Sequence, residues 1–395
     1  MKRRWMPLVA LTMAAMFTLT ACGGDNAADA NTNQGEQSTI VIDDKDPFET
    51  PDYNPEVTEA PEEITPEPEE EVAPEGMYRS ELTGEWISVD LKDQRPIAAM
   101  VDNEKTALDH YGINDCDIVY EMVNSTLNNY ITRLMCIKKD WVGTEQLGSI
   151  RSARPTNFML AGEYNAILLH DGGPFYIDVY RTQPYSNNIS GGFARFSNGK
   201  PSTYTEYVTY DTYKNPKTGK SYDGLKTRIE KAKYTTTYND FYQGEHFNFS
   251  SKELDLSGES GSITAEKIAL PFPHNSSKLD YNAETGTYDY SEYGKPHVDA
   301  ADDNKVTTFK NVIIYRAGLT QYDENGYMVY DIENNWGSGY YITDGHGISI
   351  NWVKVGQNGL TEFTNAETGE KLTMNVGKTY IAIVPKSFWD DLDIK

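Results

Sequence analysis

Residues 148–174, "GSIRSARPTNFMLAGEYNAILLHDGGP", combine two arginines, a proline, an apolar run, a histidine and two glycines. The pattern predicts a strand over 147–152, a short helix over 155–164 and a second strand over 165–171. Proline is favoured in the first turn of a helix, and a glycine pair ends a strand. A linker this short predicts a right-handed crossover between two parallel strands.

This crossover places two polar motifs at one edge of a sheet, and ligands of open α/β sheets bind beyond the carboxyl ends of the strands. Guanidinium groups suit a carboxylate or a phosphate, and a helix N-terminus adds unpaired N–H groups. A histidine can titrate or donate there, and glycines allow close backbone approach. In the alternative reading, the arginines pair with neighbouring carboxylates and Asp-Gly-Gly is only a turn. The predicted ligand-binding residues are Arg151, Ser152, Arg154, His170, Gly172 and Gly173.

Three strands precede the crossover, over 95–103, 117–123 and 130–138. The second and third are rich in β-formers and separated by a short break, which predicts a hairpin. A tight turn near residue 126 or 127 would pair residues whose numbers sum to about 253, an estimate that follows from hairpin geometry. This register brings Cys116 near Cys136 and Glu121 near Arg133. A salt bridge is the favoured role of Glu121, because a half-buried carboxylate needs a partner, and a catalytic acid is the alternative.

The N-terminus has the form of a secretory signal with a lipobox. A basic start at residues 2–4 precedes an apolar run from Trp5 to Leu19, and "LTAC" ends at Cys22. The apolar run is shorter than the ~20 residues that span a membrane comfortably. We predict a signal peptide over 1–21 and lipidation of Cys22, which would leave an extracytoplasmic protein anchored to the cell membrane.

Residues 22–80 predict a lipidated, acidic and disordered linker. Between Asp43 and Glu81 there are 15 acidic residues against two basic ones. Such a segment buries too little apolar surface to offset its ordering entropy, and its charge and prolines extend it. It would hold a folded unit away from the anionic membrane surface.

The remaining residues, 82–395, are long enough for two domains, predicted at 82–235 and 245–395. They carry 42 acidic and 30 basic residues, and nucleic-acid binding is not expected without a basic patch. The six histidines show no metal-ligand spacing, and no EF-hand loop is present. No metal and no other cofactor is therefore predicted, although an oxygen-ligated calcium site stays open.

The last part of the chain, from residue 267 onward, is rich in short β-forming runs. Asp344-Gly345, Asn358-Gly359 and Thr368-Gly369 fall between these runs, which is typical of hairpins. We expect an antiparallel meander there. The predicted fold class is α+β, with an N-terminal mixed α/β domain followed by a β-rich antiparallel C-terminal domain.

The chain resembles the YerB-like lipoprotein family, a two-domain exported family with no assigned function. The resemblance spans nearly all of 95–385, through "RPIAAMVDN", "CDIVYE", "ITR", "GSIRSARP", "H-x-G-G", "PHVD", "NVII", "GSG", "W-x-K" and "GKTYIAIVP". It implies the same two-domain division. Its motifs supply the secondary site candidates Arg133, His297, Asp299, Trp352 and Lys354.

Two departures from the family pattern favour binding over catalysis. Relatives usually carry a small residue where Asp171 stands, and often a histidine near Ser202. We expect a lipoprotein that binds an anionic cell-envelope ligand or an envelope protein. The alternatives are an adaptor without a pocket and an envelope hydrolase or transferase. The enzyme would use His170 and Glu121 as acid and base, while Arg151 and Arg154 hold the substrate.

Overall fold

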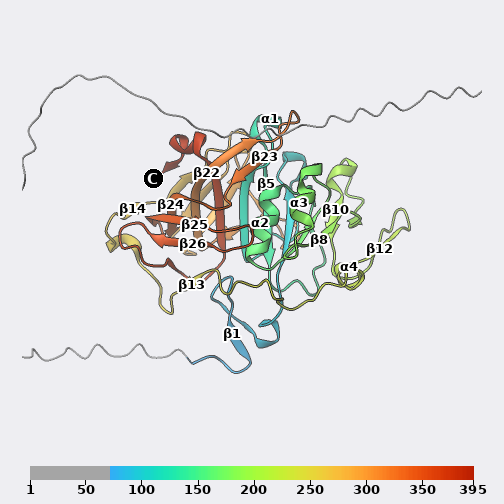
Figure 1. Ribbon diagram of the computed structural model, residues 1–395, viewed down its shortest axis with the longest axis horizontal. Coiled ribbons are helices and arrows are strands. Elements are labelled where there is room, and N and C mark those ends of the chain that lie inside the picture. Colours follow the sequence, from blue (N-terminus) through green and yellow to red (C-terminus); the bar gives the residue numbers. More distant parts are fainter. Residues whose placement is uncertain (1–71) are drawn as a thin grey trace, which may run out of the picture. The chain divides into compact units, whose positions relative to one another are not determined.

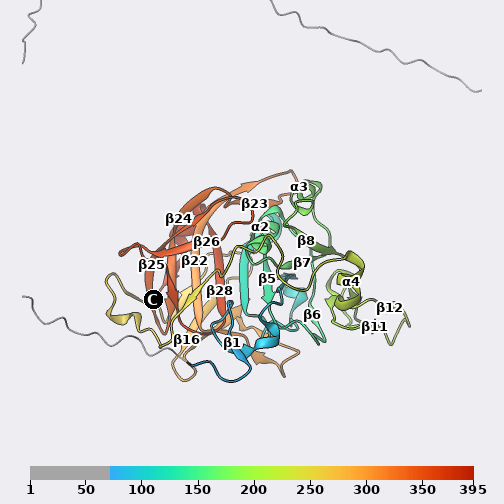
Figure 2. The ribbon, with the colours of Figure 1, turned by 60° about the horizontal axis from the view of Figure 1, so that its bottom comes forward.

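The computed structural model describes residues 72–395, which belong to one compact unit. Within these residues, twelve strands form one large sheet (Figures 1 and 2). Its main path is β14 (Ile263–Thr264), β25 (His346–Lys354), β24 (Asn335–Thr343), β22 (Asn311–Gln321), β28 (Thr379–Pro385), β4 (Ile118–Val123), β5 (Thr132–Lys138), β3 (Ile97–Asp102), β7 (Ile167–His170) and β8 (Asn187–Ser190); β23 (Met328–Asp331) pairs with β22, and β26 (Thr361–Asn365) with β25.

The centre of this sheet is β28, which lies between β22 and β4 and is parallel to both. All seven residues of β28 are buried, as are all residues of β3, β4 and β5. Continuous burial on both faces explains why these strands are apolar runs and not alternating patterns. The sheet therefore runs without a break across the predicted boundary between 235 and 245.

The two faces of β4 meet different layers. The hydroxyl of Tyr120 lies 2.7 Å from that of Tyr164, at the end of helix α2 (Pro155–Glu163). Glu121 points the other way and contacts a six-stranded sheet, where the hydroxyl of Tyr290 donates to it at 3.0 Å. That sheet contains β18 (Lys295–Pro296), β17 (Thr287–Glu292), β16 (Lys278–Asn282), β15 (Lys267–Ala269), β29 (Asp393–Ile394) and β21 (Thr308–Phe309).

The hairpin of β4 and β5 is confirmed, but the predicted register is wrong by two residues. Glu121 pairs with Leu134, and Arg133 pairs with Met122. The connection is longer than a tight turn, because α1 (Leu127–Tyr130) contains residues with positive φ. Since neighbouring residues of a strand point to opposite faces, Glu121 and Arg133 lie on opposite sides of the sheet.

The two cysteines are neighbours in the core, as the hairpin suggested. Both Cys116 and Cys136 are buried free thiols. Burial, together with a hydrogen bond to Cys116, raises the pKa of Cys136 well above its usual value. Raised pKa values keep such thiols protonated and unreactive.

The predicted crossover between parallel strands at 147–152 and 165–171 is wrong, because the first segment runs antiparallel to β3 whereas β7 runs parallel to β3. Helix α2 and strand β7 form as expected, but the parallel neighbours of β7 are β3 and β8. The segment before the helix supplies β6 (Leu147–Gly148), which pairs with β10 (Glu206–Val208) in a small sheet completed by β9 (Ala194–Arg195). The backbone of Arg151 donates to Met100 at the end of β3, so this segment runs antiparallel to β3.

The C-terminal strands follow the predicted meander except for β28. Asp344 and Gly345 both have positive φ and connect β24 to β25, so Asp-Gly marks this hairpin as expected. The chain is β-rich overall, and its helices are short. The remaining elements are α3 (Asp178–Arg181), α4 (Leu225–Ala232) and the pairs β1 (Met77–Arg79) with β2 (Trp86–Ser88), β11 (Tyr213–Lys214) with β12 (Ser221–Tyr222), β13 (Asn248–Phe249) with β27 (Thr373–Met374) and β19 (Val298–Asp299) with β20 (Lys305–Val306).

Strand β1 lies inside the segment predicted as disordered linker, so ordered structure begins before residue 80. The hydroxyl of Tyr78 donates to Glu81 at 3.2 Å, which ties this strand to the start of the folded unit. Among the residues that the structure describes, no helix has the length and apolar character needed to span a membrane.

Candidate functional site

The two motifs predicted to share a sheet edge are neighbours through their backbones. The amide of Asp171 donates to the carbonyl of Arg151 at 2.9 Å, and the amide of Ala153 donates to that of Gly172 at 3.1 Å. Both contacts lie just beyond the carboxyl end of β7. The loop before α2 and the turn after β7 are therefore in contact at the end of β7, as the sequence analysis predicted.

Arg151 is held by a carboxylate from the neighbouring strand β3. Its Nε lies 2.7 Å from Oδ2 of Asp102, whose side chain is 2 % exposed, whereas that of Arg151 is 29 % exposed. Burial, and then the charge of Asp102, raise the pKa of the adjacent Tyr204. Arg151 thus pairs with a buried carboxylate. This is the alternative interpretation of the arginines, in which they pair with Glu121 and its neighbours, but the partner is Asp102 and not Glu121.

Arg154 is a buried structural side chain. It donates to the carbonyls of Asn124 and Ala153, and its guanidinium lies 4.0 Å from the ring centroid of Tyr327. Burial lowers the pKa of Arg154 to about 10. At its backbone, Arg154 caps α2 by donating to Oδ1 of Asn157 at 2.7 Å.

The first turn of α2 is buried, so it does not offer the open anion site that the sequence suggested. Pro155, Thr156 and Asn157 are all buried. Oγ1 of Thr156 accepts a hydrogen bond from the backbone of Tyr330 at 3.0 Å. The protein's own groups occupy this end of the helix.

Arg133 and Glu121 do not form the predicted salt bridge, because the two side chains lie on opposite faces of the sheet. Arg133 donates to the carbonyl of Ser152 at 2.6 Å, and burial lowers its pKa to about 9. Glu121 accepts hydrogen bonds from a ring of neutral donors: Asn103, Thr132, Asn275, Ser277, Tyr290 and Tyr380.

His170 contacts other groups than the arginines. Its Nδ1 lies 2.8 Å from the carbonyl of Gly172, its Nε2 lies 3.4 Å from Oδ1 of Asn188, and its ring packs edge-on against Phe158. Burial lowers the pKa of His170. None of these contacts of His170 includes Arg151 or Arg154, so the convergence of the three side chains on one cavity stays a prediction.

The Gly172–Gly173 pair shapes a turn. Gly172 has φ of 75°, and a Cβ added at Gly173 would lie 2.4 Å from Cδ1 of Ile177. Both requirements are steric and internal. Ser152 is partly exposed, and its carbonyl is occupied by Arg133.

One of the C-terminal candidates, Lys354, joins α2 to the C-terminal strands. Nζ of Lys354 lies 2.9 Å from Oε1 of Glu163, and His246 donates to Oε2 of the same carboxylate at 2.8 Å. Burial alone would raise the pKa of Glu163, but Lys354 and His246 hold it at about 2. Trp352 is buried in the same sheet and donates to the carbonyl of Arg316 at 3.2 Å.

The other two C-terminal candidates contact the loop that follows β3. Asp299 accepts hydrogen bonds from the amides of Gly112 and Asn114 at 2.9 and 2.7 Å. Nε2 of His297 lies 2.8 Å from Nδ1 of His110. These contacts place both residues in a buried interface and not on a surface.

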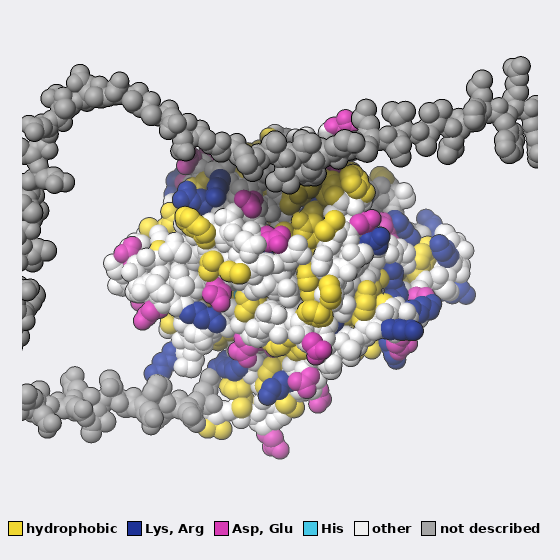
Figure 3. All heavy atoms as spheres, in the orientation of Figure 1, with side chains coloured by type: hydrophobic (Ala, Val, Ile, Leu, Met, Phe, Trp, Pro, Cys, Tyr) yellow, Lys and Arg dark blue, Asp and Glu magenta, His cyan; other side chains and the backbone are white. Residues whose placement is uncertain are grey.

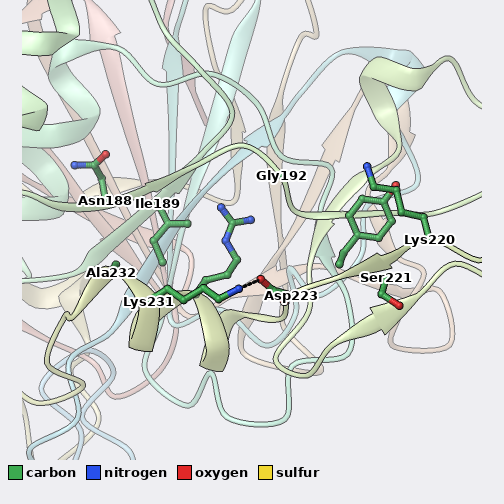
Figure 4. A pocket seen from close by; sticks show the side chains of 10 residues that line it. Asn188, Ile189, Gly192, Lys220, Ser221, Asp223, Lys231 and Ala232 are labelled. Atoms are coloured by element: carbon green, nitrogen blue, oxygen red, sulfur yellow. Dashed lines mark hydrogen bonds and ion pairs between the residues drawn. The ribbon is translucent and has the colours of Figure 1, made fainter.

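A cavity that the sequence analysis did not predict lies between β8, β12 and α4. Its volume is about 610 Å³. Figure 4 shows the side chains around it, with a dashed line from Lys231 to Asp223, whose charged atoms are 2.5 Å apart. It is lined by Asn188, Ile189, Gly192, Lys220, Ser221, Tyr222, Asp223, Arg228, Lys231 and Ala232.

Arg228 is one of three arginines near the sheet edge with a buried nitrogen that has no hydrogen-bond partner. The other two are Arg133 and Arg151, through Nε, and neither of them lines this cavity. Nη2 of Arg228 donates to the carbonyl of Gly191, and its guanidinium lies 4.1 Å from the ring centroid of Phe193. Its Nη1 is buried and makes no hydrogen bond. An unpaired donor of a cationic group is costly to bury, so an acceptor placed there would be stabilised.

The sequence did contain a signal for this site. Residues 194–234 carry nine basic and four acidic residues, in a chain whose net charge is −25. In Figure 3, Lys and Arg side chains gather on the part of the surface where Figure 1 labels β12 and α4. Averaging the charge over the folded part hid this local excess.

Comparison with known proteins assigns most of the described chain to one family. Residues 82–234 match the N-terminal domain, and residues 268–381 the C-terminal domain, of the family described as "Protein of unknown function (DUF3048)". The chain belongs to this family. The resemblance read from the sequence motifs is confirmed.

One curated DUF3048 relative and one solved structure are similar over most of the chain. The Bacillus subtilis (strain 168) protein named "Putative lipoprotein YerB" is 24% identical over 308 residues, 78% of this chain and 86% of its own length. The crystal structure of YerB protein from Bacillus subtilis has a TM-score of 0.64 and 22% identity, covering 80% of this chain and 99% of that one. The structural likeness is one of fold.

The two DUF3048 matches share one sheet in this chain. Strand β28, where the second match ends, pairs with β4 from the first match. The predicted signal peptide and the lipidation site Cys22 lie outside the described residues. The name of the Bacillus relative agrees with the lipoprotein type predicted from the N-terminal sequence.

Proposed function

We propose that this protein is an extracytoplasmic lipoprotein, anchored to the cell membrane through Cys22, that binds an anionic cell-envelope ligand in the cavity between β8, β12 and α4. Phosphate and carboxylate groups are the ligand chemistry that suits a guanidinium flanked by ammonium groups. The lipobox and the name of the Bacillus relative support the anchoring.

One observation carries the binding proposal. Arg228 directs a buried, unpartnered Nη1 toward a cavity that Lys220 and Lys231 also line, with Asp223 as the only carboxylate among the lining residues. Asp223 is paired with Lys231. The positive charges of Lys220 and Arg228 are therefore left for a ligand.

The enzyme alternative is not proposed, because the geometry does not support it. His170 and Glu121 would have to act on one substrate. Their hydrogen-bond partners have no residue in common, and Glu121 is enclosed by donors on the far face of β4.

Calorimetric titration of the full-length chain in detergent tests the binding proposal. The probes are a soluble poly(glycerol phosphate) fragment and a muropeptide, which separate phosphate from carboxylate ligands. We expect one probe to bind, and Arg228→Gln to weaken that binding about tenfold or more, equivalent to about 1.4 kcal/mol.

Lys217→Gln is the matched control, since Lys217 is exposed on the same segment and outside the cavity lining. It removes one positive charge, as Arg228→Gln does, and should change affinity less than about twofold, because exposed charges are screened. Equal losses in the two variants, or no binding of either probe, would contradict the proposed site.

The anchoring is tested separately. Because Cys22 is the predicted acceptor of the lipid, Cys22→Ser should move the protein from the membrane fraction to the medium or stall its processing. Unchanged membrane attachment would overturn the lipoprotein part of the proposal and leave the binding part standing.

A further inference from the structure

A second cluster of polar side chains lies inside the molecule, between the loop that follows β3 and the segment from β17 to β19. Its members are His110, Glu292 and His297, and all three are buried. One nitrogen from each histidine and one carboxylate oxygen lie within 4.8 Å of one another. The two histidines are 187 residues apart in sequence, so no local spacing could reveal the cluster.

The hydrogen bonds around His110 define its tautomer. Nε2 lies 2.6 Å from the carbonyl oxygen of Asp102, which only accepts hydrogen bonds. Nε2 therefore carries a hydrogen. In the neutral ring, the other nitrogen, Nδ1, is therefore a lone pair.

The same reasoning defines His297. The hydroxyl of Thr307 donates to Oδ1 of Asn114 at 2.7 Å, and Nδ2 of that amide donates to Asp302 at 3.1 Å. Since its single hydrogen is used, Thr307 must accept from Nδ1 of His297, which lies 2.9 Å away. In the neutral ring, Nε2 of His297 is therefore also a lone pair.

Two lone pairs consequently face each other across 2.8 Å, between Nδ1 of His110 and Nε2 of His297. Glu292 adds a third electron-rich atom. Its Oε1 is buried without a hydrogen-bond donor and lies 3.9 Å from Nε2 of His297. Three acceptors in a dry pocket repel one another unless a cation lies among them.

We infer that His110 Nδ1, His297 Nε2 and Glu292 Oε1 bind a divalent transition-metal ion of the zinc type. Two imidazole nitrogens and one carboxylate oxygen are a donor set that zinc prefers. The remaining ring N–H groups donate to the carbonyl of Asp102 and to the hydroxyl of Thr307, which is how metal-bound histidines are usually oriented.

Two of the three ligand separations are close to those of a tetrahedral site. Bonds of 2.0–2.1 Å imply ligand atoms separated by about 3.3 Å. The observed separations of 2.8 Å and 3.9 Å lie on either side of that value. The third separation is at most 4.8 Å, so closing all three ligands on one ion requires shifts of up to about 1.5 Å.

The position of the cluster indicates a structural role. His110 belongs to the segment between β3 and β4, whereas Glu292 and His297 flank β18. A metal ion would join these two segments inside the protein, where all three ligands are inaccessible to substrate.

Metal loading of the purified full-length chain tests this inference. After incubation with Zn²⁺ and removal of excess metal, elemental analysis should give about one zinc per chain, and X-ray absorption at the zinc edge should show imidazole scattering. Zn²⁺ should raise the unfolding temperature, because a ligand that binds only the folded state stabilises it. A content below about 0.1 zinc per chain, or a zinc environment without imidazole, would overturn the inference.

Glu292→Gln and His346→Gln form the variant pair. Gln at 292 keeps the size of the side chain but removes the anion, and should reduce zinc affinity at least about tenfold. His346 is partly exposed and bonds to the backbone of Asp344, outside the cluster, so its variant should bind zinc as the parent does. If Glu292→Gln does not fold, the absorption spectrum of the unaltered protein decides the question. Equal binding by both variants would contradict the site.

A proton is the competing occupant. In that case one of the two rings is an imidazolium at neutral pH in metal-free protein, which ¹⁵N spectra of the histidine side chains distinguish. An imidazolium that persists in the presence of excess Zn²⁺ would overturn the inference. Signals of His110 and His297 that shift on addition of Zn²⁺, while those of His346 stay, would support it.

Discussion

Two groups of basic side chains lie near the carboxyl ends of β7 and β8, and they differ in whether they line the cavity beside α4. Around the start of α2, Arg133, Arg151 and Arg154 each contact protein acceptors: the carbonyl of Ser152, the carboxylate of Asp102 and the carbonyl of Asn124. Around α4, Arg228 contacts the carbonyl of Gly191 and lines a cavity of about 610 Å³. Arg133 and Arg151 also keep a buried nitrogen without a hydrogen-bond partner, but neither lines that cavity.

This difference shows that arginine content alone does not identify a binding site. The arginines of the conspicuous motif stabilise the loop before α2, whereas the less conspicuous basic segment lines the cavity. Substitutions should therefore separate the two groups: those in the first should reduce stability, and those in the second should reduce binding.

The largest effect is expected where α2 is joined to the C-terminal sheet. Lys354→Met leaves the buried carboxylate of Glu163 without its main countercharge, and breaking such a pair costs about 3–5 kcal/mol of unfolding free energy. Denaturant unfolding measures this loss. Lys371→Met, at an exposed position of the same region, should change stability by less than about 0.5 kcal/mol. Similar losses of unfolding free energy in the two variants would show that the Lys354–Glu163 pair does not stabilise the contact between α2 and the C-terminal strands.

The same carboxylate makes the protein sensitive to acid. The pKa of Glu163 is lowered from 4.5 to about 2 in the folded protein. A lowered folded-state pKa stabilises the protein above the unfolded value, so this stabilisation is lost as pH falls from about 4.5 to about 2. At most about 3 kcal/mol depends on it, at about 1.4 kcal/mol per pKa unit. The free energy of unfolding, measured at several pH values between about 2 and 4.5, should depend less on pH in Lys354→Met than in the parent. An identical pH dependence in the two proteins would contradict this role of Glu163.

Arg154→Ala should have a smaller but clear effect on stability. It removes the donor to two buried carbonyls and the contact with Tyr327, a combined cost of about 2–4 kcal/mol. Thermal unfolding checks this value. Arg181→Ala is the control, because Arg181 is half exposed and pairs only with Asp178 on its own helix. A stable Arg154→Ala variant would reopen a ligand-binding role for this arginine.

Arg228→Gln should have the smallest effect on stability, about 1 kcal/mol or less. It loses the stacking on Phe193 and one bond to a backbone carbonyl, but leaves no buried carboxylate unpaired. Denaturant unfolding should place it close to the parent. A loss as large as that of Arg154→Ala would remove the distinction between the two groups.

Features set by local chemistry were predicted correctly from the sequence. Asp344-Gly345 specified its hairpin because both residues accept positive φ, and Pro155 marked the first residue of α2. The hairpin of β4 and β5 was found as well, but its register was not. Three consecutive residues with positive φ, Asn128 to Tyr130, lengthen the turn. No signal in the sequence indicated this longer turn, so the register could not be predicted.

Features that depend on distant partners were missed. The parallel neighbour of β7 is β3, about 70 residues earlier, as in the pairing of Ile167 with Ile97. Asp102, the actual partner of Arg151, ends that strand. His110 and His297 meet only because two segments 187 residues apart in the sequence pack together. Such pairings are selected by tertiary packing, which leaves no periodic trace in the sequence.

The position of β28 has a consequence for the order in which the molecule is completed. In the export that we propose, the chain would emerge N-terminus first, and β3, β4, β5, β7 and β8 would be outside the cell before residues 379–385 arrive. Until then β4 and β22 each present an unpaired edge, and open edges invite pairing with other chains. In a chain that ends at Gly377, the segments containing β4 and β22 should both be cleaved faster by a protease than in the full chain. β28, which only β29 follows among the described strands, thus joins the early strand β4 to the C-terminal strand β22, so the large sheet stays open until nearly the whole chain is available.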